Sequence, residues 1–438
     1  MEMQPISICL CGDILLSQRI PPVPYTGFDE LCKLMRSHEC RCGNLESTYH
    51  DKEGYPSAFP GGHYCMARPE CLDDLQRMGF NLVATANNHA MDYSHGGLLA
   101  TLRHLDERGI AHAGTGANLA EASRAAFYEC SSGRVGLIGI TSSFHDSYAA
   151  GPQNCELQGR PGVAPLRHKA VYELEPRMFA AIQEIAEACM VNANHKWGVD
   201  NGFVQENPCV HFGTYDFQRA GENHVRTTPH GEDLQRTVQA IQDARYFCDL
   251  IVVSLHSHQF AGLSSEQPTE FARIFCQQCI DAGADIVFCT GPHVLRGIEQ
   301  YGRGIIFHGL GNFIFQNDEM DYLPEEFYRR RMTTRERETG VGGIGNIMTH
   351  GWTRGLPVTK EAWESVLVSA ICTPGEIQVT LHPVSMLYRG FPKGLKGLPV
   401  LSRDTAVLHR LQELSGAWGT ELRVNETEKT AGIVIPRG

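Results

Sequence analysis

Residues 81–97 read NLVATANNHAMDYSHGG, and this stretch decides the fold class. NLVATA is a short apolar run typical of a buried strand, and it stops on the polar residues Asn87, Asn88 and His89. GLLATLRHLDERG (97–109) follows with the spacing of an amphipathic helix that ends on Gly109. A buried strand, a polar turn and a covering helix predict one unit of an α/β sheet.

The same alternation extends in both directions along the chain. Toward the N-terminus, ISICLCG (6–12) predicts a strand and FDELCKLMRSH (28–38) a helix. Toward the C-terminus, the rhythm returns in DLIVVSLH (249–256), in the helical PTEFARIFCQQCIDAG (268–283) and in ADIVFCT (284–290). GIEQYGRGIIFHGLG (297–311) predicts a hairpin. We therefore expect one α/β domain over residues 1–385.

Three segments break this rhythm. Residues 141–230 are rich in Gly, Pro, Asn and His, and they predict a loop-rich insertion with one helix near 175–190 that could form a lid. Residues 318–360 include the charged run RRRMTTRERE and predict a second insertion, either a solvated helix or a mobile loop. Residues 386–438 predict a C-terminal extension with a helix near 403–414.

Composition narrows the classes of partner and compartment. The formal net charge of −12 argues against a nucleic-acid partner held through phosphate contacts. The opening MEMQPISICLCGD lacks a basic signal region, and no apolar run is long enough for a membrane anchor. Several of the 16 cysteines lie in apolar runs, which favours reduced thiols and a cytoplasmic location. Oligomeric state is left open.

One cysteine pair lies in a predicted helix. Cys276 and Cys279 are three residues apart, so they share one face of the helix within 268–283. A zinc site would need a second pair at suitable spacing. We interpret this pair as helix packing in preference to zinc binding.

Residues of metal-ligand type gather just after the apolar strands. Ligands of open α/β sheets bind at the carboxyl ends of the strands, so these side chains are expected to converge. Carboxylate, amide oxygen and imidazole are the ligands of divalent metals of intermediate hardness. His308 also follows a strand but is interpreted as structural. The convergent set is Asp13, Asn44, Glu46, Asn88, His89, Asp92, His256, His258, His293 and Asn312.

Six segments then resemble successive motifs of the CapA family, which is named for poly-γ-glutamate capsule biosynthesis. They are CGDILLS, CGNLES, ANNHAMDYSHGG, VVSLHSHQF, GADIVFCTGPHVLRGIE and GLGNFIF, between Ile6 and Phe315. The family belongs to the calcineurin-like metallophosphoesterase superfamily. The resemblance implies a four-layer α-β-β-α sandwich of two facing sheets flanked by helices, with a metal site at the strand ends.

The resemblance also implies roles for individual residues. His89 matches the acid/base histidine, with Asp13 as its expected acidic partner, and His293 is a further catalytic candidate. His258, Arg296 and Asn312 are the expected substrate contacts. The cofactor would be one or two divalent ions, with manganese, iron, zinc and calcium all admissible. The implied metal ligands are Asp13, Glu46, Asn88, His256 and His293.

Several positions depart from the family pattern. Gly291 stands where the family often has the first histidine of a His-Pro-His motif. His258 and Phe260 replace a Gly and a Glu, and Leu15 replaces the histidine of ordinary phosphoesterases. Either one tightly bound metal or a pair with altered ligands fits these changes.

Four functions are compatible with these residues. The first is a metal-dependent hydrolase or transferase that acts on a peptide or poly-γ-glutamate-like amide. The second is a metal-dependent peptide Cα epimerase, with His89 and His293 as bases on opposite faces. The third is phosphoester hydrolysis, and the fourth is a non-catalytic role in capsule assembly.

Overall fold

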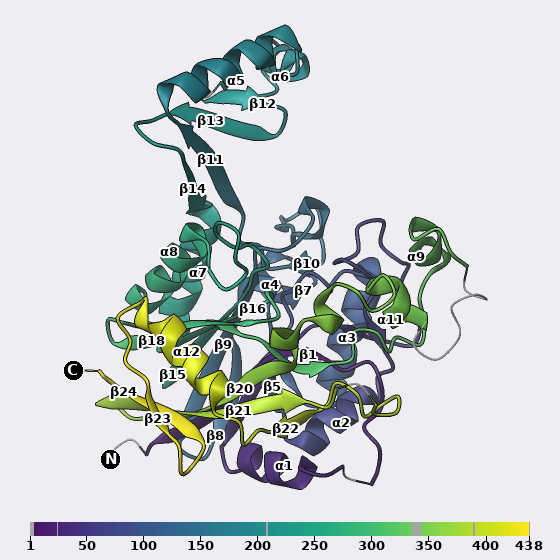
Figure 1. Ribbon diagram of the computed structural model, residues 1–438, viewed down its shortest axis with the longest axis vertical. Helices are drawn as coiled ribbons and strands as arrows, with labels where there is room; N and C mark the ends of the chain where they lie inside the picture. The colour runs from purple at the N-terminus through teal and green to yellow at the C-terminus, as the bar shows by residue number, and fades with distance from the viewer. Residues whose placement is uncertain (1–3, 24, 207–208, 335–342, 389, 438) are drawn as a thin grey trace.

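The computed structural model describes residues 4–23, 25–206, 209–334, 343–388 and 390–437 (Figure 1). Two large sheets form the body. The ten-stranded sheet has the path β23-β24-β21-β20-β1-β2-β5-β6, with β19 beside β1 and β22 beside β21. The six-stranded sheet has the order β17-β18-β16-β15-β9-β8. The chain is therefore a mixed α/β fold, as the sequence predicts.

The strands closest to the site are parallel neighbours. In the larger sheet β1 pairs with β2, and β2 pairs with β5; in the smaller sheet β15 lies between β9 and β16. Parallel strands buried on both faces read as continuous apolar runs. Their bounds are β1 Ile6–Leu15, β2 Cys40–Leu45, β5 Leu82–Ala84, β6 Ala111–Ala113, β8 Ala126–Cys130, β9 Gly133–Thr141, β15 Leu250–His256, β16 Ile286–Thr290 and β19 Asn312–Phe315.

One apolar core lies between the two sheets. It joins Leu10 of β1 and Val368 of β20 to Leu137 of β9 and Val252 of β15. A second core packs the larger sheet against α1 and α2, and a third packs the smaller sheet against α7 and α8. These helices are α1 Phe28–Arg36, α2 Cys71–Met78, α7 Gly231–Ala244 and α8 Glu270–Asp281, with α3 Ser94–Glu107 beside β3 and β6.

Residues 168–229 form an arm that stands out from the body (Figure 1). It is a four-stranded sheet in the order β12-β13-β11-β14 with two helices. The predicted loops were wrong here, although the helix expected near 175–190 is confirmed. The strands are half exposed, so they lack a continuous apolar signal. The elements are β11 His168–Leu174, α5 Pro176–Ala188, α6 Ala193–Asp200, β12 Val210–Phe212, β13 Tyr215–Arg219 and β14 His224–Pro229.

Two other predicted segments join the body. The hairpin predicted at 297–311 is confirmed as β17 Leu295–Tyr301 and β18 Gly304–Leu310. The C-terminal residues do not form a separate extension, because β24 continues the larger sheet beside β21 and α12 packs on β17. The elements are β20 Glu364–Cys372, β21 Glu376–Met386, β22 Pro399–Leu401, α12 Ala406–Gly416, β23 Arg423–Asn425 and β24 Thr430–Pro436.

The second insertion is helical where it is described. It contains α9 Glu325–Arg330, α11 Gly343–Met348 and two short 3-10 turns. Residues 335–342, which hold the end of the charged run, lie outside the described residues. The short elements that remain are β3 Thr48–Tyr49, β4 Met66–Ala67, β7 Thr115–Gly116, α4 Leu119–Ser123 and β10 Gly162–Val163. Within the described ranges, none of the helices has the length and apolarity needed to cross a bilayer.

Candidate metal centre

The predicted ligand residues meet at the carboxyl ends of the strands of both sheets. Asp13 lies on β1, Glu46 follows β2 and Asn88 follows β5. His256 ends β15, and His293 follows β16. All five side chains belong to one network of short contacts, so the two sheets supply opposite sides of a single centre.

Glu46 lies at the middle of this centre. Its Oε1 is 3.5 Å from His256 Nε2 and 3.9 Å from both His258 Nε2 and His293 Nε2. The carboxylate is fully buried, and neither oxygen accepts a hydrogen bond. Burial, with the nearby Asp13 carboxylate, raises the pKa of Glu46 well above its ordinary value. Such an unpaired buried carboxylate is costly unless a cation satisfies it.

Two groups of ligand atoms share Glu46. One group is Glu46, His256 and His258, and the other is Asp13, Glu46 and His293. In each group the ligand atoms lie within 4.8 Å of one another. The Glu46 carboxylate is therefore common to two groups of side chains that could each hold a cation, and His258 belongs to the first group.

Asp13 accepts one hydrogen bond on each carboxylate oxygen. Asn44 Nδ2 donates to its Oδ1 at 2.7 Å, and the Gly291 amide donates to its Oδ2 at 3.0 Å. Burial alone would raise its pKa, but the neighbouring His256 and His293 imidazoles hold the pKa of Asp13 well below its usual range. Asp13 therefore stays ionised, whereas the neighbouring Glu46 carboxyl is driven toward the neutral form when no cation is bound.

Asn88 presents its amide oxygen to the centre. Oδ1 is 2.8 Å from His256 Nε2, while Nδ2 donates to the Gly61 carbonyl at 2.6 Å. That carbonyl contact fixes the orientation of the amide, because only the nitrogen can donate. A Cβ at Gly61 would lie 2.5 Å from the Asn88 carbonyl oxygen, so glycine is required for this approach.

His293 has an unusual backbone and a fixed ring. Its φ is +58°, in the left-handed region that non-glycine residues rarely occupy and that occurs most often at functional sites. Its Nδ1 lies 2.8 Å from Asn312 Oδ1, and Asn312 Nδ2 donates to the Ala362 carbonyl at 2.8 Å. Asn312, predicted as a substrate contact, is thus committed to orienting His293.

His89 pairs with a different carboxylate from the one predicted. Its Nδ1 lies 2.6 Å from Asp92 Oδ2, so the expected pairing with Asp13 was wrong. His89 and Asp92 are three residues apart in one turn, which brings their side chains together. The backbone amides of Gly61 and Cys65 donate to the same Asp92 carboxylate at 2.8 and 2.7 Å. The pair leaves His89 Nε2 as the atom that can give or take a proton.

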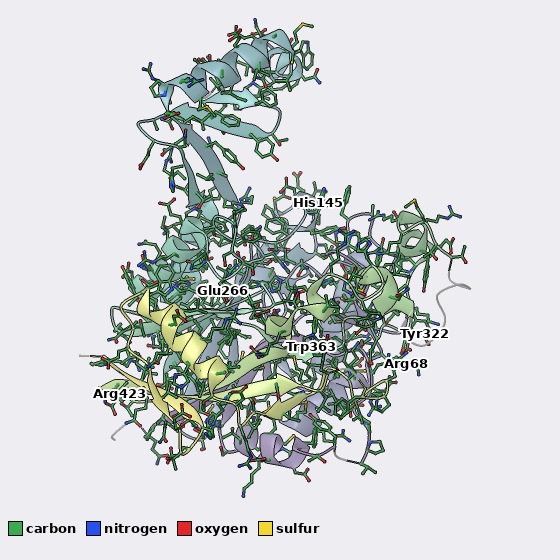
Figure 2. All side chains as sticks on the ribbon, viewed as in Figure 1. Arg68, His145, Glu266, Tyr322, Trp363 and Arg423 are labelled. Atoms are coloured by element: carbon green, nitrogen blue, oxygen red, sulfur yellow. The ribbon has the colours of Figure 1, made fainter. Side chains whose placement is uncertain are left out.

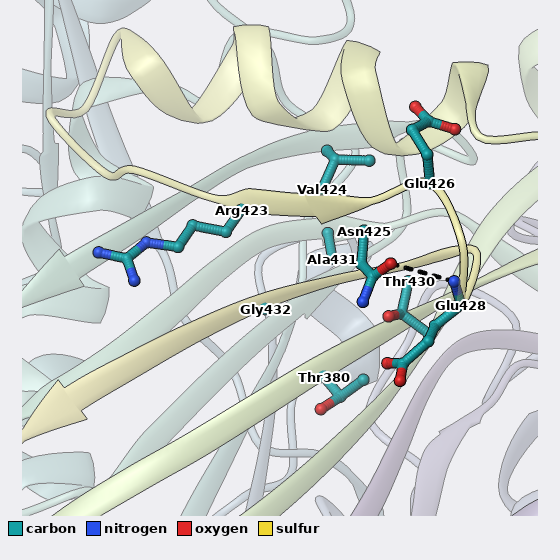
Figure 3. Close-up of a pocket in the computed structure, with 9 residues that line it drawn as sticks. All are labelled: Thr380, Arg423, Val424, Asn425, Glu426, Glu428, Thr430, Ala431 and Gly432. Atoms are coloured by element: carbon teal, nitrogen blue, oxygen red, sulfur yellow. Dashed lines mark hydrogen bonds between the residues drawn. The ribbon is translucent and has the colours of Figure 1, made fainter.

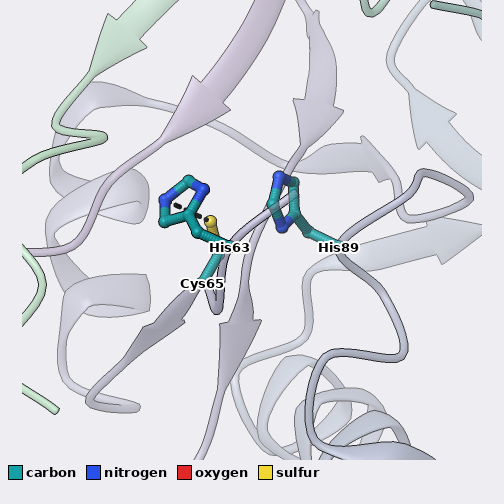
Figure 4. A group of neighbouring side chains, drawn as sticks. All are labelled: His63, Cys65 and His89. Atoms are coloured by element: carbon teal, nitrogen blue, oxygen red, sulfur yellow. Dashed lines mark hydrogen bonds between the residues drawn. The ribbon is translucent and has the colours of Figure 1, made fainter. Parts of the chain in front are cut away.

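Two residues near His89 were not predicted. Figure 4 shows His63, Cys65 and His89 as neighbours, with His63 Nε2 3.5 Å from Cys65 Sγ. Burial, followed by the effect of His89, lowers the pKa of His63 well below its ordinary value and keeps its ring neutral. Neither residue follows a long apolar strand, so the pattern that revealed the other ligands gives no signal for them.

Arg296 does not face the centre. It is 1% exposed, and its Nε and Nη2 donate to the carbonyls of Ser265 and Gln259 at 2.7 and 3.0 Å. Arg296, which the sequence predicts as a substrate contact, therefore uses its guanidinium to support the loop at 259–265.

A cavity of about 420 Å³ opens beside the centre. Asn88 and Gly61 line one side, and Phe59, His145 and Arg330 line the others. The rings of Phe59 and His145 stack with centroids 3.9 Å apart. Figure 2 places His145 at the edge of the body nearest the arm. The cavity has the size, and the mixture of aromatic and polar groups, of a pocket for a small ligand.

A second hollow lies elsewhere, on the C-terminal hairpin (Figure 3). Arg423 and Glu426 line it, and the Glu428 amide donates to Asn425 Oδ1 at 3.1 Å. Its volume is about 650 Å³, but Asn425 simply closes the turn between β23 and β24. None of the candidate ligands lines this hollow.

Comparison with known proteins identifies the relatives. The family model described as bacterial capsule synthesis protein PGA_cap matches residues 7–317. The uncharacterized proteins y4sH and y4uA of Sinorhizobium fredii are each 30% identical over 434 residues, covering 95% of this chain and 90% of theirs. The PGA biosynthesis protein CapA of Bacillus subtilis is 23% identical over 71% of this chain and 63% of its own. The capsule biosynthesis protein CapA of Bacillus anthracis is 22% identical over 72% and 61%.

Proposed function

Because this chain belongs to the bacterial capsule synthesis family PGA_cap, we propose that it is a metal-dependent enzyme that hydrolyses or transfers a γ-glutamyl-type amide. The observation that carries the proposal is Glu46, a fully buried carboxylate with both oxygens unpaired between two sets of ligand atoms. The names of the two Bacillus relatives favour a capsule polymer, poly-γ-glutamate or a γ-glutamyl peptide, as the substrate class.

The donor set fits a pair of divalent cations. Glu46, His256 and His258, with Asn88 beside them, would hold one cation, and Asp13, Glu46 and His293 would hold the other. Oxygen and imidazole donors of this kind suit manganese, iron or zinc. When bound, such ions polarise a carbonyl and lower the pKa of a coordinated water.

The protein's own residues would handle protons and substrate. His89, oriented by Asp92 at 2.6 Å, presents Nε2 as the general acid for the leaving amine. The ring of His293 is fixed by Asn312 and lies on the opposite side of the centre from His89. The cavity beside Asn88 would hold the substrate, and Arg330 at its wall offers a cation to an α-carboxylate.

The same comparison supports a finer assignment of the fold. Two sheets share one core, and helices cover the outer face of each sheet. We assign this arrangement to the four-layer calcineurin-like sandwich, with residues 168–229 as an arm that stands outside the layers.

The activity test uses the full chain stripped of metal and reloaded with manganese, iron or zinc. We expect amine release from γ-glutamyl peptides or poly-γ-glutamate to require the metal. Release should fall at least about 100-fold in His89→Gln and be unchanged in His409→Gln, a variant of an exposed histidine.

Running the assay in deuterium oxide separates the alternatives. Incorporation of deuterium at Cα without amine release would contradict amide cleavage and favour the epimerase. Turnover of phosphoesters alone would favour the third function. Absence of every activity in the metal-loaded chain would leave the assembly role.

A further inference from the structure

A second cluster of ligand-type side chains lies on the other face of the six-stranded sheet. Cys276 comes from α8, Cys289 from β16 and His308 from β18. Consecutive residues of a strand face opposite sides, so Cys289 packs toward α8 while Thr290 contacts His256 of the first centre. The two clusters are therefore distinct.

The cluster is compact and closed. Cys276 Sγ is 3.5 Å from Cys289 Sγ, and the two sulfurs and a His308 ring nitrogen all lie within 4.8 Å of one another. Cys276, Cys289 and His308 are 0%, 3% and 1% exposed. Two thiolates bound to one tetrahedral ion at about 2.3 Å would be about 3.8 Å apart, close to the observed separation.

His308 is oriented as a metal ligand would be. Its Nε2 lies 2.9 Å from Glu299 Oε2, and Arg273 and Gln277 hold that carboxylate, each at 2.8 Å from Oε1. The carboxylate fixes the tautomer with the proton on Nε2. Nδ1 is then the buried ring nitrogen that is left for the two sulfurs. A carboxylate behind the imidazole is the usual support of a ligating histidine.

The sulfur chemistry agrees with this geometry. Contacts with Cys276 and His308 lower the pKa of the buried Cys289 thiol below its ordinary value, whereas the contact with Cys289 and burial raise the pKa of Cys276. The thiolate is the form that binds metal, and Cys289 is the thiol whose surroundings favour that form. Cys279, on the same helix, packs in the same apolar core but does not belong to the cluster.

We propose that Cys276, Cys289 and His308 form a second metal site for a thiophilic ion of the zinc and copper(I) kind. Thiolate and imidazole ligands select these ions over the harder cations that suit the first centre. Burial closes the site to substrate, so its role is structural: it ties α8 to β16 and β18. The alternative is the simple packing role that the sequence favours for Cys276, in which Cys289 and His308 pair with each other without an ion.

The test measures zinc and copper per chain by mass spectrometry in a background that lacks the first centre, Asp13→Asn with Glu46→Gln. We expect about one equivalent to remain in that background, to be lost in Cys289→Ser and to be kept in Cys279→Ser. Cys279 is equally buried on α8, so this control removes a core thiol without touching the site. Loss of metal in both cysteine variants, or none in the background, would overturn the proposal.

Two measurements do not depend on the stability of variants. X-ray absorption of the zinc-loaded wild type should show sulfur neighbours at about 2.3 Å. Cobalt(II) in place of zinc should give a sulfur-to-cobalt charge-transfer band in the near ultraviolet. A Cys276–Cys289 disulfide in the protein purified under reducing conditions would contradict the metal site.

Discussion

Substitution of Glu46 by glutamine should have opposite effects on stability with and without metal. In the metal-free protein Glu46 is a buried carboxyl whose pKa is raised by burial and by Asp13. The unfolded chain releases this proton above its ordinary pKa of 4.5, whereas the folded chain retains it. The free energy of unfolding therefore falls as pH rises, and Glu46→Gln removes that loss.

Two estimates give a similar magnitude. Holding a carboxyl neutral costs about 1.4 kcal/mol for each pH unit above its ordinary pKa of 4.5, or at most about 3 kcal/mol at pH 7. If both carboxylates stay ionised instead, their ligand atoms within 4.8 Å repel by at least about 3 kcal/mol at an effective dielectric constant of 20. We expect metal-free Glu46→Gln to be more stable than wild type by up to about 3 kcal/mol at pH 7, and equal to it near pH 4.

Metal should reverse this order. A ligand at 1,000 times its Kd stabilises the protein that binds it by about 4 kcal/mol, which exceeds the advantage of the metal-free variant. The wild type should gain about that amount from zinc or manganese, and Glu46→Gln should gain little. Urea unfolding with chelator and with metal, at pH 4 and pH 7, measures both differences, and Glu421→Gln on the exposed surface is the control. A metal-free variant less stable than wild type at pH 7 would refute this reasoning.

Three further substitutions test individual contacts. Asp92→Asn should reduce turnover about 100-fold while metal content is unchanged, since Asp92 supports His89 and is not among the ligands; loss of metal would contradict the assigned role. Gly12→Ala places a Cβ 1.9 Å from the Gly311 carbonyl oxygen and should lower the free energy of unfolding by about 3 kcal/mol or more, whereas Gly375→Ala, with open space around it, should be neutral in thermal unfolding. Arg296→Met should cost about 2 kcal/mol in urea unfolding with little change in KM, and a raised KM alone would restore it as a substrate contact.

The sequence reveals the parts of this site that follow apolar strands. Asp13, Glu46, Asn88, His256 and His293 each come after such a strand, and parallel strands bring those positions to one edge. The motifs that carry the resemblance to the CapA family lie within residues 7–317, and that resemblance is confirmed.

The features that the sequence did not predict depend on contacts that the pattern of a single strand does not reveal. His89 pairs with Asp92 and not with Asp13, because a turn brings residues three apart closer together than residues on separate strands. His63 lies in a long loop before β4, where spacing is uninformative. The arm was missed because its strands are half exposed, so their side chains follow neither the buried nor the alternating pattern.

Anomalous diffraction from crystals soaked in manganese or zinc tests whether Glu46 lies between two cations. We expect two anomalous peaks, one on each side of the Glu46 carboxylate, the first beside His256 and the second beside His293. A single peak that does not contact Glu46, or no peak at these strand ends, would contradict it.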